Sequence, residues 1–202
     1  MAEATTGVRN TALGSRAISV GITTGDDNIA VGYLTGGALT SGNQNVLVGN
    51  QAGDAITIGR YNTSLGHISL GANILTDNNV AIGHQALNLF VGDGSTNNQN
   101  GYNTAVGPSA GAAMTTGVQN TVVGALAGDA ITTGANNTFM GLNAGGATTT
   151  GAGNTCIGNG AGDSILVGHD NIIIGEQADT GAGNGSNQII IGTDANSSFG
   201  SN

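Results

Sequence analysis

Two histidines have the spacing that comes closest to a chemical site in this chain. His67 and His84 are 17 residues apart, whereas His169 stands apart from both. In a structure that stacks every 17 residues, the two rings would lie roughly 5 Å apart and could hold a metal ion between them. Because the sequence suggests no third ligand, we interpret the pair as exposed polar turn residues and expect neither a metal nor a cofactor.

A catalytic site is not indicated by the remaining reactive residues. Nucleophilic catalysis needs a nucleophile, a base and an orienting group, and no spacing in this chain links its Ser, His and Asp residues into such a set. The glycine-rich stretches are not phosphate-binding P-loops, because that motif needs a lysine and the chain has none. We therefore predict no catalytic residues and a protein that is not an enzyme.

Three aspartates follow an Ala-Gly pair at equivalent places in the sequence. They are Asp54, Asp129 and Asp163, and together they could form part of an acidic edge. Calcium binding in turns is one interpretation, but the dense nonapeptide pattern of calcium-binding repeats is absent. We favour solvated turn aspartates.

These residues recur because the chain is an internal repeat. An Asn precedes a short aliphatic run that ends in Gly, and this unit occurs eleven times, at steps of 18, 17, 17, 17 and 24 residues and then 17 residues five times. Ten units begin with an asparagine: Asn10, Asn28, Asn45, Asn62, Asn79, Asn103, Asn120, Asn137, Asn154 and Asn171. The eleventh begins with Gln188.

The repeat predicts an all-β fold, a parallel β-solenoid (a β-roll or β-helix) of about eleven coils with a 17-residue period. Counting from the Asn as position 1, position 4 is a larger aliphatic residue and position 5 is Gly in every unit. We expect a short strand at positions 2 to 4, a glycine corner at position 5 and a second short strand near positions 11 to 14. Stacking at about 4.8 Å per coil gives a rod roughly 50 Å long, in which the asparagines form a hydrogen-bonded ladder.

Strand alternation then suggests which side chains point outward. We expect position 4 and position 2 to point into the coil and position 3 to point away from it. An exposed apolar stripe usually marks an interface, so we predict a homo-oligomer, a trimer about the rod axis. The expected interface residues in the position 3 column are Leu47, Val122, Phe139, Cys156, Ile173 and Ile190.

The repeat also sets the domain organisation. A solenoid domain over 10–196 follows a short arm, 1–9, and precedes a tail, 197–202. One step carries seven extra residues, which we place as an inserted loop near 87–101. Insertions in solenoids become surface loops, so this one is either a tolerated loop or a contact site.

Composition excludes several classes of partner. Charged residues make up 7% of the chain and the net charge is −9, so no basic face exists for nucleic acid or anionic lipid. No apolar run approaches the roughly 20 residues of a membrane span, and no secretory signal is visible. The one cysteine, Cys156, excludes an intrachain disulfide, and we interpret it as a small hydrophobic residue that fills the oligomer interface.

Segments such as Asn28-Ile-Ala-Val-Gly32 and Asn79-Val-Ala-Ile-Gly83, spaced by Ala-Gly and Thr-Gly turns, carry a family resemblance. They resemble the head repeats of trimeric autotransporter adhesins and the repeats in the shafts of bacteriophage tail fibres. The resemblance covers roughly residues 7 to 195. It implies a trimeric parallel β-roll that extends from a surface and contacts a host. The coil is longer than that of the autotransporter heads, and the chain shows no coiled-coil stalk and no membrane-anchor barrel.

The sequence therefore favours a structural or adhesive fibre protein of a phage virion, such as a tail fibre or appendage, that gives rigid multivalent attachment. Its expected partners are copies of itself, another virion protein docked at one end, and a host surface receptor or glycan. One alternative is the head of a bacterial surface adhesin, or a self-assembling filament subunit, located outside the cell. Another is an ice-binding solenoid, which the adjacent threonines at positions 13 and 14 disfavour because their side chains point in opposite directions.

Overall fold

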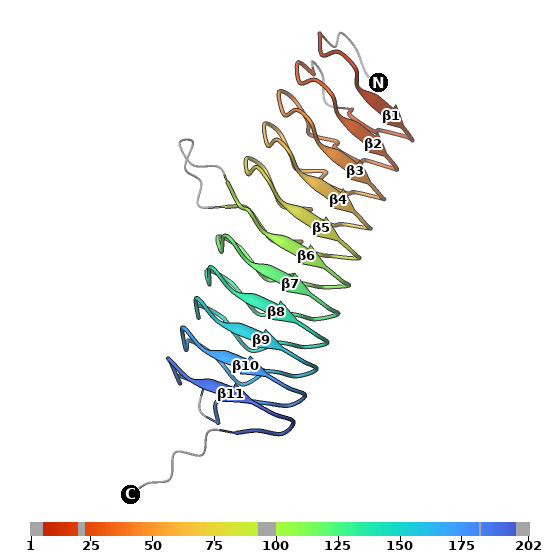
Figure 1. The fold of residues 1–202 in the computed structure, drawn as a ribbon. Coiled ribbons are helices and arrows are strands. Elements are labelled where there is room, and N and C mark those ends of the chain that lie inside the picture. The colour runs from red at the N-terminus through yellow and green to blue at the C-terminus, as the bar shows by residue number, and fades with distance from the viewer. Residues whose placement is uncertain (1–5, 20–22, 93–99, 182, 197–202) are drawn as a thin grey trace, which may run out of the picture.

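Short strands separated by glycine corners recur along the chain in the computed structural model, which describes residues 6–19, 23–92, 100–181 and 183–196. Eleven parallel strands form one sheet in sequence order, as Figure 1 shows, and the chain winds through about ten turns of a β-solenoid. The described residues contain no helix. The strands are β1 (Thr11–Leu13), β2 (Ile29–Val31), β3 (Val46–Val48), β4 (Thr63–Leu65), β5 (Val80–Ile82), β6 (Thr104–Val106), β7 (Thr121–Val123), β8 (Thr138–Met140), β9 (Thr155–Ile157), β10 (Ile172–Ile174) and β11 (Ile189–Ile191). The predicted fold class is confirmed.

The strands are in register, so each position of the repeat stacks on the same position of the next coil. Thr121 of β7, for example, pairs with Thr138 of β8 and Val123 with Met140. The register continues across the longest step of the repeat, where Ala81 of β5 pairs with Ala105 of β6. Any property shared by one column of the repeat therefore becomes a continuous stripe along the rod.

Glycine at position 5 is required by the corner that follows each strand. Gly124 has a φ of +140°, a conformation that side chains rarely adopt. A Cβ atom on Gly124 would also lie 2.2 Å from the carbonyl oxygen of Gly141 in the next coil. Two independent constraints, backbone conformation and contact between coils, thus explain why this position is Gly in all eleven units.

The second strand predicted at positions 11 to 14 is wrong, because no strand is assigned there within the described residues. Adjacent coils still exchange backbone hydrogen bonds along this wall: the Thr115 N–H donates to the Thr132 carbonyl at 2.9 Å, and the Thr132 N–H donates to Thr149 at 2.8 Å. The chain reaches this wall through left-handed residues, such as Leu126 with a φ of +58°.

The core lies inside the coils and is lined from the sheet side by position 3. This overturns the predicted orientation of the strands, because positions 2 and 4 point outward instead. Each position 3 residue expected at an oligomer interface is buried within its own chain: Leu47, Val122, Phe139, Cys156, Ile173 and Ile190. These side chains pack against position 8 and position 12 of the opposite wall, so they cannot also contact another subunit.

Position 9 explains why position 3 can alternate between small and large side chains. A glycine at position 9 leaves room for a large side chain from its own coil or from a neighbouring coil. The Cβ sites of Gly53 and Gly145 face Leu47 and Phe139 of the same coil. Gly36 has Ala30 in its own coil, and its Cβ site lies 3.0 Å from Leu47 of the next coil. Where position 9 is a buried leucine, position 3 is small: Leu70 has Ser64 in its own coil, and Leu87 has alanine in its own coil and in the next. The two walls are therefore complementary in volume, as close packing requires.

The described residues before the inserted segment keep the geometry of the coil. Leu87 and Phe90 keep their buried positions in the core, and the backbone N–H groups of Val91 and Gly92 still bond the next coil at the Thr115 carbonyl. Residues 93–99, within the predicted loop at 87–101, lie outside the described residues, as does the predicted tail at 197–202. At the other end, part of the predicted arm continues the solenoid, since the Gly7 N–H donates to the Thr23 carbonyl.

Candidate binding surface

The outward side chains of the sheet form a continuous uncharged and mostly apolar surface, which we call the outer sheet face. It consists of the first and third residues of every strand, that is, positions 2 and 4. Position 4 is Leu, Val, Ile or Met in all eleven strands, position 2 is Thr, Ile or Val, and none of these residues is charged. Exposed fractions reach 72% at Ile189 in the terminal strand and 45% at Leu65 in an interior one. The strands line up along one side of the rod (Figure 1), so this surface runs the length of the sheet.

The size of this surface is in the range of the largest apolar patches that single chains expose, which are often functional. Ten steps of about 4.8 Å and a strand width of roughly 10 Å give an area on the order of 500 Å². Contiguous apolar patches beyond a few hundred Å² usually mark an interaction site. Sequence reasoning predicted an apolar stripe but placed it at position 3. The signal that finds it is position 4, which is aliphatic in every coil although it points outward.

The asparagine ladder is present as predicted and lies at the buried corner that precedes each strand. Each Asn Oδ1 accepts the backbone N–H and the side-chain amide of the next Asn, as in the bonds from Asn137 to Asn120 at 3.0 and 3.1 Å. The Asn120 amide also donates to the carbonyl of Gly134 at 2.9 Å. The ladder runs unbroken from Asn10 to Asn171, and its longest amide bond, 3.5 Å from Asn103 to Asn79, spans the insertion. Its role is structural, because these amides are bonded along the axis.

The two neighbouring histidines do stack, as their spacing predicts. The ring centroids of His67 and His84 are 5.4 Å apart and the rings are nearly parallel, at 9°. Both side chains are exposed on the turn after the sheet. No group of three or more His, Cys, Asp or Glu residues that could hold a metal ion occurs in the described part of the chain. His169 is remote in sequence from this pair and contacts Asp170 at 2.9 Å.

The three position 10 aspartates lie in separate coils and do not form a cluster. Partial burial raises the pKa of the Asp54 and Asp129 carboxyl groups, and backbone N–H groups partly offset this effect in both. Burial and the nearby charge of Asp179 raise the pKa of Asp163. These carboxylates sit on partly desolvated turns, which differs from the fully solvated setting that the sequence suggested.

Cys156 lies inside the coil, which corrects its predicted place at an oligomer interface. Its side chain is buried among core residues of positions 3 and 12, and it forms no disulfide. Burial, with a contribution from the charge of Asp179, raises the pKa of the thiol to about 12. A thiol in this setting stays protonated and acts as a small hydrophobic residue.

Comparisons with protein-family models, with curated proteins and with solved structures find no match to this chain. Among the described residues, no helix is long and apolar enough to cross a membrane. The surfaces of the solenoid itself are therefore the guide to its function.

Proposed function

We propose that this chain is a structural subunit of an attachment fibre, in which three copies pack side by side through their outer sheet faces. The observation that carries the proposal is the outward column of eleven aliphatic side chains at position 4. Water would surround this column in a single chain, whereas packing sheet against sheet removes it from water. A second copy suits the surface because a flat, uncharged face of one repeat matches the same face of another.

The number of copies and the virion setting are supported by the resemblance of the repeat to the shafts of bacteriophage tail fibres. A rod of in-register coils has few internal degrees of freedom, so it can hold contacts at a fixed distance from its base. Three copies then present every surface feature three times, and multivalency allows individually weak contacts to add up. Rigid multivalent attachment is the function that follows.

Light scattering coupled to size exclusion tests this packing. We expect a mass three times the 19.5 kDa of one chain. Lysine at two outward sites, Ile82→Lys and Val123→Lys together, should convert the assembly to monomers, because the outer sheet face cannot bury unpaired charge. Leu142→Lys is the matched control, since Leu142 is 52% exposed on the turn beyond the sheet. A native monomer would refute the proposal, and a mass that grows with concentration would favour end-to-end filaments.

A second candidate is ice binding, which one feature of the outer sheet face favours. Four consecutive strands carry threonine at their outward position 2, paired in register about 4.8 Å apart. No hydrogen bond within the described chain engages these hydroxyl groups, so they are available to water. The four residues are Thr104, Thr121, Thr138 and Thr155. The threonines at positions 13 and 14 are a different set, in which the Thr132 hydroxyl donates to the carbonyl of Thr149 in the next coil.

Thermal hysteresis separates the two candidates, because both use the same face. A trimer that buries the threonine row leaves no face for ice and should show no hysteresis. A monomer with hysteresis that Thr121→Lys removes would establish ice binding instead. The matched substitution Leu142→Lys, beyond the sheet, should leave the hysteresis unchanged.

A further inference from the structure

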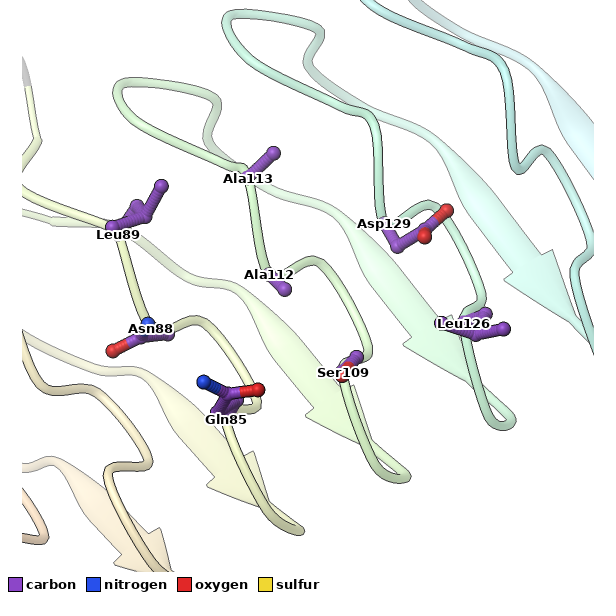
Figure 2. A pocket seen from close by; sticks show the side chains of 8 residues that line it. All are labelled: Gln85, Asn88, Leu89, Ser109, Ala112, Ala113, Leu126 and Asp129. Atoms are coloured by element: carbon purple, nitrogen blue, oxygen red, sulfur yellow. The ribbon is translucent and has the colours of Figure 1, made fainter.

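A hollow of about 290 Å³ opens on the wall of the solenoid that lies across the core from the sheet. Figure 2 shows that three consecutive coils contribute to it, with strands of the sheet passing behind them. Ala110 and Met114 of the middle coil point into the core. The remaining side chains of this segment therefore face the solvent, on the opposite side from the outer sheet face. The hollow stays accessible when copies pack through their sheets.

The hollow exists because the middle coil has small side chains where its neighbours have larger ones. Its floor is Ser109, Ala112 and Ala113, at positions 7, 10 and 11 of the repeat. The coil before it carries Leu89 at position 11, and the coil after it carries Leu126 at position 7. These two leucines are 49% and 43% exposed and form apolar walls at either side.

Polar side chains also line the hollow, although the Asn88 amide oxygen turns toward Gly71 of the preceding coil. The side-chain amides of Gln85 and Asn88 stand on one coil and the hydroxyl of Ser109 on the next (Figure 2). No hydrogen bond within the described chain engages these three side chains. Left-handed backbone at Gln85 and Ser109, with φ of +58° and +57°, fixes the position 7 side chains on the outer surface.

A single carboxylate completes the lining on the third coil. Asp129 lies beside Leu126, and partial burial raises the pKa of its carboxyl group. The backbone N–H groups of Asp129 and Ala130 offset part of that effect, which leaves oxygen lone pairs free to accept further hydrogen bonds. The lining thus holds amides and a hydroxyl that both donate and accept, and one strong acceptor.

We infer that this hollow is a binding site for one ring of a neutral saccharide. Sugar hydroxyl groups both donate and accept hydrogen bonds, as the amides of Gln85 and Asn88 and the hydroxyl of Ser109 require. The C–H face of a sugar ring is apolar and suits a wall such as Leu89. This inference deepens the proposed attachment function, on which it rests, by naming the chemical class that the fibre would contact.

Charge and size argue for this ligand class over others. The lining contains no Lys, Arg or His side chain, and the net charge of the chain is −9, so phosphorylated or acidic sugars would be repelled. A volume of about 290 Å³ lies at the small end of the range for ligand pockets. A shallow site of this size gives weak binding by itself, and three copies on one fibre would strengthen it through multivalency.

The test is a glycan array of neutral and acidic oligosaccharides probed with the labelled native protein, followed by competition with free methyl glycosides. Asp129→Asn removes the charged acceptor at unchanged size, and Ala113→Leu fills the floor with the residue that position 11 already has at Leu89. Each should weaken binding to neutral glycans about tenfold, Asp129→Asn because a charged hydrogen bond is lost and Ala113→Leu because its larger side chain occupies the space of the ligand. The matched controls are Asp163→Asn and Ala55→Leu, which make the same changes at positions 10 and 11 of other coils.

Each outcome of this experiment decides one question. Neutral-glycan binding that the two hollow variants weaken and the two controls keep would establish the site. No binding to neutral glycans, binding to acidic glycans alone, or equal binding by all four variants would overturn the inference. Light scattering on the same samples keeps the two proposals apart. A trimer without glycan binding contradicts the site alone, and a monomer that binds through the hollow contradicts the side-by-side packing alone.

Discussion

Gly145 and Phe139 occupy one volume of the core from opposite walls of the same coil. A Cβ atom on Gly145 would lie 2.4 Å from two carbon atoms of the Phe139 ring, and the φ of Gly145 is +62°. The aromatic ring is therefore accommodated only because position 9 has no side chain. The pair is the extreme case of the volume complementarity that runs along the solenoid.

This relationship predicts the effect of exchanging volume between the two walls. Gly145→Ala should destabilise the fold by about 2 kcal/mol or more, through overpacking against Phe139 and the left-handed backbone. Phe139→Ala should cost about 3 to 5 kcal/mol through the cavity that it leaves. The double variant Phe139→Ala with Gly145→Leu should recover part of that loss, since Leu87 already pairs with alanine in this way. Thermal unfolding followed by circular dichroism measures each change, and a double variant no more stable than Phe139→Ala would contradict the complementarity.

The same pair shows which parts of the fold could be predicted from the sequence and which could not. The Asn and Gly columns predicted the coil, its period and the asparagine ladder, because each depends on a local requirement that recurs at a fixed spacing. The inward face was assigned wrongly because position 4 is uniformly aliphatic whereas position 3 ranges from Ala81 to Phe139. That range looks unsuited to a core until position 9 is compared with it. The signal was present in the sequence but connects two walls of the coil and not neighbours within one strand.

The hollow on the opposite wall could not be predicted from the sequence, for a related reason. It depends on differences in side-chain size among three successive coils, from Leu89 through Ala113 to Leu126. No single motif encodes such a difference. It becomes visible only once positions 7, 10 and 11 are known to point outward, which requires the paths of the turns that carry them.

The hydroxyl group of Thr148 is buried and has no hydrogen-bond partner. Among the described residues, it is the one buried polar side-chain atom in this state. Thr148 occupies position 12, where the neighbouring coils have Ile131 and Ile165. Thr148→Val should raise the free energy of unfolding by about 1 kcal/mol, because the hydroxyl is desolvated without compensation. Thr35→Val is the opposite case, since the Thr35 hydroxyl donates to the carbonyl of Gly49. It should destabilise the fold, and a gain in stability there would show that the hydroxyl bond contributes nothing.

An interior rung of the asparagine ladder should contribute more than a terminal one. Asn120→Ala removes an amide that donates to Asn103 and to the Gly134 carbonyl, and an oxygen that accepts from Asn137. We expect a loss of about 3 kcal/mol, because several buried polar groups are left without partners. Asn10→Ala should cost less, since Asn10 is only partly buried and lies at the end of the ladder. Chemical denaturation compares the two, and equal costs would mean that the ladder does not act as a buried network.

Cys156 tests the corrected orientation of the strands. Burial raises the pKa of its thiol to about 12, so at pH 8 an alkylating reagent should react with it only after unfolding. A cysteine placed at the exposed turn, Leu142→Cys in a Cys156→Ala background, is the control and should react at once. Mass spectrometry of the labelled chains follows both reactions. Fast labelling of Cys156 in the native protein would show that position 3 points outward and would contradict the buried orientation.

Acid should stabilise this protein over part of the pH range. Burial raises the pKa of Asp54 and Asp129 above the ordinary value of 3.8, and burial with the charge of Asp179 does the same for Asp163. Between 3.8 and the raised values, the folded chain binds more protons than the unfolded chain, so stability increases as the pH falls through that window and decreases as it rises. Asp27 works in the opposite direction, because its hydrogen bond with Arg9 lowers its pKa.

Melting temperatures from pH 7 to pH 4 measure this dependence. The native chain should melt at a higher temperature near pH 4.5 than at pH 7, and a net charge of −9 adds to the effect because acid relieves repulsion. Replacing all three raised aspartates, Asp54→Asn, Asp129→Asn and Asp163→Asn, should stabilise the fold at pH 7 and flatten the profile. Asp27→Asn is the control, since it removes a contribution of opposite sign and should leave the rise toward acid in place. A triple variant whose profile matches that of the native chain would assign the dependence to net charge alone, because the raised carboxyl groups would then contribute nothing.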